Sequence, residues 1–152
     1  MKKLFTMRLG KLKDIKSLVQ FNYDMALETE NKMLDKKTLK KGVKKVLKKK
    51  TDAFYIVTAM QKTLIASLMI TKEWSDWKSS HYWWIQSVYV KPEYRRKGIY
   101  RKLYKKVNKI ASKSNDCCGI RLYVEKDNTV AKKTYFSLNM NESDYEIFEA
   151  NI

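Results

Sequence analysis

A group of cations beside a glycine is the part of this sequence best suited to bind an anion. Arg95, Arg96 and Lys97 precede Gly98, and a periodic apolar stretch that predicts a helix follows. A helix N-terminus offers unpaired backbone N–H groups and about half a positive charge, and glycine lets the backbone approach a ligand closely. The segment therefore predicts a pyrophosphate site, although an ordinary strand-to-helix junction with cations for solubility has the same pattern.

The elements on both sides of this segment must position it. His81–Val90 is dense in aromatic and β-branched residues, which predicts a central strand, and Pro92 ends that strand. The following helix is expected from Gly98 to about Ser114, with Ile99, Leu103, Val107 and Ile110 on one face. The order strand, basic loop and helix is the arrangement that an anion site of this kind needs.

A second set of polar residues follows the next predicted strand. Gly119–Glu125 alternates apolar and polar residues, and Asn128–Leu138 is expected to form a short helix. Asn128 suits the N-cap of that helix and carries an amide that can also bind a ligand. Tyr135 falls on the apolar stripe of the helix, so packing in the core is an alternative to a chemical role.

The rest of the chain alternates between apolar periods of two and of 3.6, which is typical of a mixed α/β domain. We expect further strands at Lys3–Leu9, Ala53–Met60, Thr63–Thr71 and Tyr145–Ala150, one helix from Leu12, another around Leu39–Leu47 with Asp35 as its N-cap, and a loop at Lys72–Ser80. No repeat or linker divides the sequence, so we expect a single domain over residues 1–152.

The charge of the chain is strongly positive, at +17, but only five of its 33 basic residues are arginines. Specific nucleic-acid recognition favours the planar fork of arginine, so binding of nucleic acid is not the expected role. No apolar run is long enough to span a membrane. Cys117 and Cys118 are neighbours, and with the single histidine they are too few for a structural zinc site. We expect a cytoplasmic protein with free thiols and no metal.

Two motifs resemble those of the GNAT N-acetyltransferase family. The family's acyl-CoA-binding motif is Q/R-x-x-G-x-G/A, and Arg95 and Gly98 match its first and fourth positions. Tyr100 stands where a small residue is usual. The flanking residues Val90, Pro92, Tyr94, Lys97 and Ile99 are also typical of the family. Downstream, Asn128, Ala131, Tyr135, Leu138 and Met140 match the next motif, in which Asn139 replaces a usual glycine.

The resemblance implies both a fold and an activity. The fold is of the α/β (α+β) type, with a central mixed, mostly antiparallel sheet and flanking helices. The activity is transfer of an acetyl group from acetyl-CoA to a primary amine of a small molecule or protein, by direct attack in a ternary complex. The partners are then acetyl-CoA and an amine acceptor, and a homodimer is also compatible with the family.

The resemblance further implies the roles of single residues. The cofactor would lie along Val88, Tyr89 and Val90, with the N–H near Val88 as oxyanion donor. Its phosphates would be held by Arg95, Arg96, Lys97, Gly98, Ile99 and Tyr100, and its pantetheine arm by Asn128. We expect Ile85–Val90 and Gly119–Glu125 to splay apart to admit it. Tyr135 would protonate or hydrogen-bond the leaving thiolate.

The general base is less evident. Many relatives carry a carboxylate on the central strand where this chain has Gln86, which orients water or substrate but accepts no proton. Glu28 and Glu30, at the end of the first helix, border the acceptor cleft in this fold, and their spacing directs them to different helix faces. We therefore expect at most one of them, taken as Glu28, to bind the amine.

Two other classes of function stay open at this point. A basic nucleic-acid-binding module would bind duplexes with steep salt dependence and ignore CoA. A GNAT-like sensor would bind CoA and transfer nothing, which the missing strand carboxylate permits.

Overall fold

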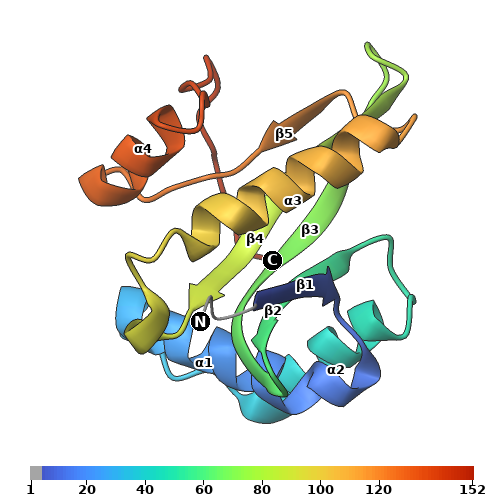
Figure 1. The fold of residues 1–152 in the computed structure, drawn as a ribbon. Helices are drawn as coiled ribbons and strands as arrows, with labels where there is room; N and C mark the ends of the chain where they lie inside the picture. The colour runs from blue at the N-terminus through green and yellow to red at the C-terminus, as the bar shows by residue number, and fades with distance from the viewer. Residues whose placement is uncertain (1–4) are drawn as a thin grey trace. The chain divides into compact units, whose positions relative to one another are not determined.

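Five strands form one sheet in the order β1-β2-β3-β4-β5 (Figure 1). They are β1 (Phe5–Leu9), β2 (Phe54–Met60), β3 (Thr63–Ser75), β4 (Ser80–Val90) and β5 (Gly119–Arg121). Pairing is antiparallel from β1 to β4 and parallel between β4 and β5. The mixed, mostly antiparallel sheet expected from the sequence is confirmed.

This computed structural model describes residues 5–152, so Lys3 and Leu4 of the first predicted strand lie outside the described residues. The contacts of the chain group into two compact units, one that ends at Leu122 and one that comprises Tyr123–Ile152. The sheet belongs to the first unit. No helix among the described residues is both long enough and apolar enough to cross a membrane.

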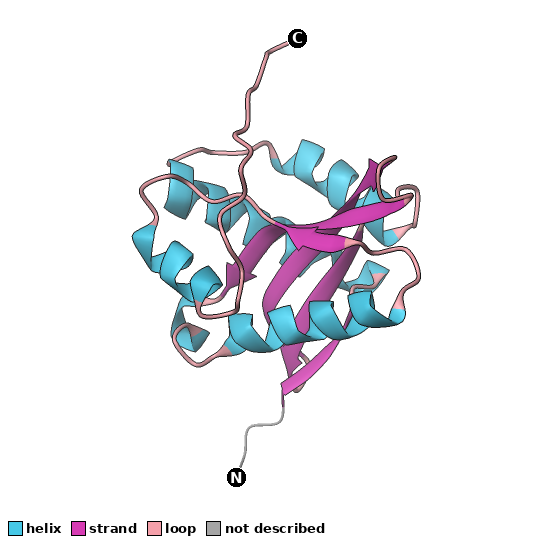
Figure 2. Ribbon diagram, turned by 90° about the horizontal axis from the view of Figure 1, so that it is seen from above, coloured by secondary structure: helices cyan, strands magenta, loops and turns pink. Residues whose placement is uncertain are grey.

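Helices cover both faces of the sheet in the first unit (Figure 2). On one face, α1 (Ile15–Glu30) and α2 (Lys36–Leu47) pack onto β2, β3 and β4. The buried cluster on that face is formed by Leu18, Phe21, Val43, Tyr55, Val57, Ala59, Leu64 and Tyr89. On the other face, α3 (Ile99–Lys113) buries Ile99, Leu103 and Val107. As predicted, Asp35 caps α2, because its Oδ2 accepts a hydrogen bond from the Thr38 N–H at 2.8 Å.

A bulge interrupts β4 near its C-terminal end. Ser67 on β3 pairs with Tyr89, but Met69 pairs with Gln86, so β4 carries one extra residue at this point. Ser87 there adopts a φ of +50°, in the left-handed region. Bulges re-aim the side chains and backbone groups around them, and this one lies between Gln86 and Val88.

The pairing of β4 with β5 is short. It joins Tyr82, Trp83 and Trp84 to Gly119, Ile120 and Arg121 and extends no further. The six residues from Ile85 to Val90 thus continue β4 beyond its last pair with β5. The pairing ends where β5 ends, at Arg121, and the splaying of Ile85–Val90 from Gly119–Glu125 stays a prediction.

The hairpin between β3 and β4 is longer than predicted. β3 runs to Ser75, and Trp74 pairs with His81 in register, so the loop expected over 72–80 is wrong for 72–75 and is reduced to a turn between Ser75 and Ser80. Lys72 and Glu73 are held in the strand because they pair with Trp83 and Tyr82 on β4. The polarity of the segment alone gives no sign of this pairing.

The second unit contains α4 (Thr129–Phe136), capped by Asn128 as predicted. The strand predicted at Tyr145–Ala150 is wrong, because this segment has no regular structure. Its apolar side chains, including Phe148 at 92% exposure, have no strand to pair with among residues 123–152. The predicted strand Gly119–Glu125 also shortens, and ends at Arg121.

Candidate active site

The basic loop connects β4 to α3 through a short 3-10 turn, Pro92–Tyr94. Gly98 occupies the N-cap of α3 with a φ of +72°, a conformation that favours glycine. Because glycine has no side chain, it cannot cap the helix, and an anion would meet the first amides of α3 directly. The fifteen-residue helix aligns its dipole with that anion.

The space beside the Cα atom of Gly98 is open to a ligand. A Cβ built on Gly98 would meet no atom within 4 Å. The exposed Arg96 beside it also has a positive φ, +59°, so two residues of the loop turn their backbone into the left-handed region. The open backbone, the helix end and the cations together fit the phosphates of CoA.

The side chains of Lys97 and Arg95 in the loop form bonds with other groups of the protein. Lys97 Nζ donates to the Glu93 carbonyl at 2.7 Å. Arg95 Nη2 lies 2.7 Å from Glu28 Oε2 on α1, and Arg95 Nε donates to the Val90 carbonyl at 2.8 Å. The structure therefore brings Arg95 together with Glu28, a pair that the sequence assigned to opposite substrates.

The end of β4 carries Tyr89 toward α1. Its ring is buried and lies 4.9 Å from the ring of Phe21, and its hydroxyl donates to Glu28 Oε1 at 3.4 Å. Burial raises the pKa of Tyr89, and the negative charges of Glu28 and Asp24 raise it further, against a smaller opposing effect of Arg95. Tyr89 is therefore a neutral hydrogen-bond donor near pH 7.

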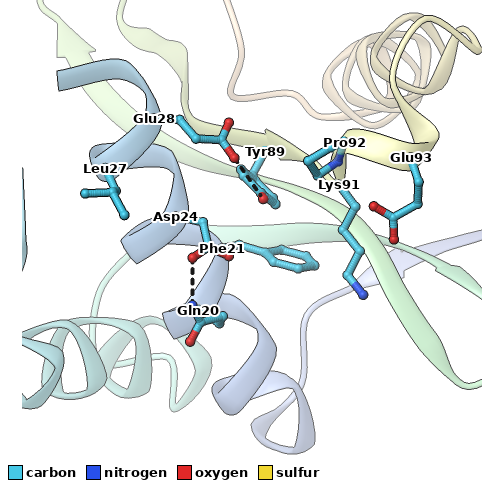
Figure 3. Close-up of a pocket in the computed structure, with 9 residues that line it drawn as sticks. All are labelled: Gln20, Phe21, Asp24, Leu27, Glu28, Tyr89, Lys91, Pro92 and Glu93. Atoms are coloured by element: carbon cyan, nitrogen blue, oxygen red, sulfur yellow. Dashed lines mark hydrogen bonds between the residues drawn. The ribbon is translucent and has the colours of Figure 1, made fainter. Parts of the chain in front are cut away.

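A cleft of about 420 Å³ opens beside Tyr89, between α1 and the turn after β4 (Figure 3). Its lining includes Asp24 and Glu28 from α1 and Glu93 from the turn, with Lys91 as the one cation. The Arg95 guanidinium, paired with Glu28, adds a second cation at the wall, so three carboxylates face two cations and the cleft keeps an excess of negative charge in a chain of net charge +17. Such a site attracts a cation rather than an anion.

Of the two glutamates at the end of α1, the structure places Glu28 in the cleft and pairs Glu30 with Lys32 at 3.1 Å. Only Glu28 of the two is among the residues that line this cleft, and its role in binding an amine stays a prediction. Sequence reasoning missed Asp24, which lies one turn before Glu28 on the same helix face. The spacing of four from Gln20 to Asp24 to Glu28 was the signal for it, and Gln20 Nε2 donates to Asp24 Oδ1 at 2.7 Å.

Gln86 is held in place by the neighbouring strand. Its Nε2 donates to Thr71 Oγ1 at 2.6 Å, in a partly buried position. Val88 follows the bulge, so the backbone around it is offset from regular pairing.

Asn128 and Tyr135 belong to the second unit. Asn128 Oδ1 accepts from the Ala131 N–H at 3.0 Å, which leaves the amide nitrogen as the donor that a ligand could use. Burial raises the pKa of Tyr135. The neutral hydroxyl is therefore suited to donate a hydrogen bond.

The comparison with family models decides the relationship. Residues 17–139 match the acetyltransferase (GNAT) family. The chain belongs to this family. The match begins within α1 and extends past α4, so it includes the cleft, the loop and both predicted motifs except Met140.

Solved structures agree with this assignment. The GNAT chain is 44% identical to a possible acetyltransferase from Clostridium difficile 630, with a TM-score of 0.91 and 98% of each chain covered. A predicted acetyltransferase with acetyl-CoA from Clostridium acetobutylicum is 20% identical, with a TM-score of 0.77 and coverage of 97% of this chain and 96% of the other. That second likeness supports the fold alone. No protein of curated function matches the sequence.

As a member of this family, the protein is an acetyl-CoA-dependent N-acetyltransferase. Among residues 5–152, no three histidine, cysteine, aspartate or glutamate side chains gather as a group that could hold a metal ion.

Proposed function

We propose that this GNAT enzyme acetylates a primary amine that binds as a cation in the acidic cleft, by direct attack on acetyl-CoA in a ternary complex. The observation that carries the proposal is that the cleft and the phosphate loop share one short stretch of chain. Tyr89, Lys91 and Glu93 line the cleft, and the loop begins two residues after Glu93. An amine in the cleft therefore lies at the same end of β4 as the loop.

In this proposal the cofactor lies along β4. The backbone of Val88, Tyr89 and Val90 pairs with the pantetheine arm, because β4 has no β5 partner there. The first amides of α3, from Ile99 and Tyr100, hold the phosphates together with Arg96 and Lys97. The amide nitrogen of Asn128 binds the pantetheine arm.

The amine must lose its proton before it attacks. At a reference pKa of about 10.4, freeing the lone pair at pH 7 costs roughly 4.6 kcal/mol. The carboxylates of the cleft attract the ammonium ion but also favour its charged form. We assign Glu28 to bind the ammonium and to take part in removing its proton, and Gln86 to orient the amine or a water that carries the proton away.

In the transfer step a carbon–nitrogen bond forms and the carbon–sulfur bond of the thioester breaks. The amine nitrogen forms a bond to the acetyl carbon, and the carbonyl oxygen becomes negative and accepts a hydrogen bond from the N–H near Val88. The carbon–sulfur bond then breaks, and the sulfur leaves with its electron pair. The neutral hydroxyl of Tyr135 donates a hydrogen bond to this thiolate, and the amine proton leaves through the cleft.

The two neighbouring cysteines, Cys117 and Cys118, are free, which suits a reducing compartment. The cytoplasm is where we place the reaction.

An acceptor screen tests the proposal. The purified protein is incubated with acetyl-CoA and spermidine, L-lysine, kanamycin or a peptide with a free N-terminus, and each amine is examined by mass spectrometry for a gained acetyl group. We expect at least one amine to be acetylated, and Glu28→Gln or Asp24→Asn to raise its KM about tenfold through loss of a charge-assisted contact. Binding of CoA without acetylation of any amine would instead support a sensor.

A further inference from the structure

The side chain of Arg95 contacts the last turn of α1 and the last residues of β4. Its Nη2 pairs with Glu28 at 2.7 Å, and its Nε donates to the Val90 carbonyl at 2.8 Å. Its guanidinium carbon also lies 5.6 Å from the centre of the Tyr89 ring, within cation–π range. These contacts fix the guanidinium against one wall of the cleft.

The cation that pairs with Glu28 comes from outside α1, whereas Glu30 pairs with Lys32 just past the helix end. The last turn of α1 contains no basic residue, although it carries two glutamates. A helix C-terminus has about half a negative charge, which disfavours carboxylates there. Arg95, from outside the helix, supplies the positive charge that holds Glu28 in this turn.

The hydrogen bonds of Glu28 then define a fixed geometry. One carboxylate oxygen is paired with Arg95, and the other accepts the Tyr89 hydroxyl. The ion pair is about 40% exposed on both sides, so screening leaves it little value for stability. Its effect is to hold the carboxylate in one position at the cleft wall.

We propose that Arg95 is a positioning residue for the acceptor amine, acting through Glu28, rather than a ligand of the CoA phosphates. The inference rests on the proposed function, because it assigns the cleft to the amine. Arg95, the first residue of the cofactor motif, then serves the binding of the acceptor amine rather than the binding of CoA. Phosphate binding is then left to Arg96, Lys97 and the amides at the start of α3.

Two measurements on six proteins test this. The proteins are the wild type, Arg95→Gln, Arg95→Lys, Glu28→Gln, the double variant Arg95→Gln/Glu28→Gln, and Lys105→Gln, which removes one exposed positive charge from α3 as a control. The dissociation constant of CoA is measured by calorimetry. Steady-state kcat and KM are measured with the amine that the wild type acetylates fastest in the acceptor screen.

Arg95→Gln is expected to lower kcat/KM for the amine about tenfold, mostly through KM, and to change the CoA dissociation constant less than about twofold. In the Glu28→Gln background, the same substitution should change the kinetics of the amine less than twofold, because its effect passes through Glu28. Arg95→Lys keeps the charge and should recover part of the loss. Lys105→Gln should behave as the wild type.

The proposal is overturned if Arg95→Gln weakens CoA binding tenfold or more, which would make Arg95 a phosphate ligand that leaves Glu28 when CoA arrives. It is also overturned if the loss in kcat/KM is the same with and without Glu28. A wild type that binds no CoA or acetylates no amine contradicts the proposed function instead, so the two failures are distinguishable.

Discussion

The Gln86 side chain on β4 donates a hydrogen bond of 2.6 Å to the Thr71 hydroxyl on β3. This bond fixes the orientation of the amide immediately before the bulge at Ser87. A glutamine held in this way is suited to orient a substrate or a water molecule at the end of the paired part of the sheet.

Removal of the Gln86 amide is therefore expected to slow catalysis without affecting cofactor binding. Gln86→Ala should lower kcat about tenfold, and Thr71→Val, which keeps the amide but releases it, should lower kcat by a smaller factor. Neither should change the CoA dissociation constant. Steady-state kinetics and calorimetry check this, and an unchanged kcat in Gln86→Ala would exclude Gln86 from the reaction.

Gly98 controls how closely the backbone approaches a phosphate. Gly98→Val should weaken CoA binding by more than about tenfold, because a β-branched residue resists a φ of +72°. Lys97→Ala removes one exposed charge that salt screens and should weaken binding only about twofold. Calorimetric titrations at one fixed ionic strength compare the two variants, and thermal unfolding confirms that both are folded.

Equal losses for Gly98→Val and Lys97→Ala would show that side-chain charge, not the backbone, holds the phosphates. Gly98→Ala provides the matched control, because an alanine at this position must adopt the same unfavourable φ with the smallest side chain.

Tyr135 provides a test that separates a chemical role from packing. Tyr135→Phe keeps the ring and removes the hydroxyl, and we expect kcat to fall on the order of a hundredfold with little change in CoA affinity. Because burial raises the pKa of Tyr135, its hydroxyl stays protonated below about pH 10, and it should cause no alkaline loss of kcat below that pH. A phenylalanine variant with near-normal turnover would remove Tyr135 from the mechanism.

Asp14 is a stability determinant that lies outside the site. It is 5% exposed and receives two hydrogen bonds from Arg8, at 2.7 and 2.9 Å. Burial alone would raise its pKa, but the bonds from Arg8 and the Lys11 N–H outweigh burial and lower it. Asp14→Asn should therefore reduce the free energy of unfolding by about 3 kcal/mol at pH 7.

The pH dependence of this loss follows from the lowered pKa. The stability that Asp14 contributes is present above its unfolded pKa of about 3.9 and disappears as the pH falls through the lower folded value. The difference between wild type and Asp14→Asn in urea unfolding should hence shrink in acid. A difference that is constant from pH 7 to pH 3 would contradict the ionised pair.

Much of the fold could be predicted from apolar periodicity. The strand, loop and helix around Gly98 were placed within one residue, because a long strand, a proline and a periodic helix follow one another there. Two kinds of error came from non-local effects. Cross-strand pairing extends β3 through polar residues to Ser75, and the segment Tyr145–Ala150 has no strand to pair with in its unit.

The site was less accessible to sequence reasoning than the fold. The bulge at Ser87 has no glycine to mark it, so the local pattern reads as a regular strand. The pairing of Arg95 with Glu28 joins residues 67 positions apart, and no local rule connects them. Asp24 could have been found from its spacing of four to Glu28, whereas its place in a cleft depends on the packing of α1 against β4.

The most direct test of the account is to locate the bound cofactor by NMR. Uniformly ¹⁵N-labelled protein is titrated with acetyl-CoA, and the amide shifts are followed residue by residue. The account predicts saturable changes that are largest at Val88, Gly98 and Ile99, with the lysine-rich surface of α2 unaffected. Changes centred on α2, or no change at millimolar acetyl-CoA, would contradict it.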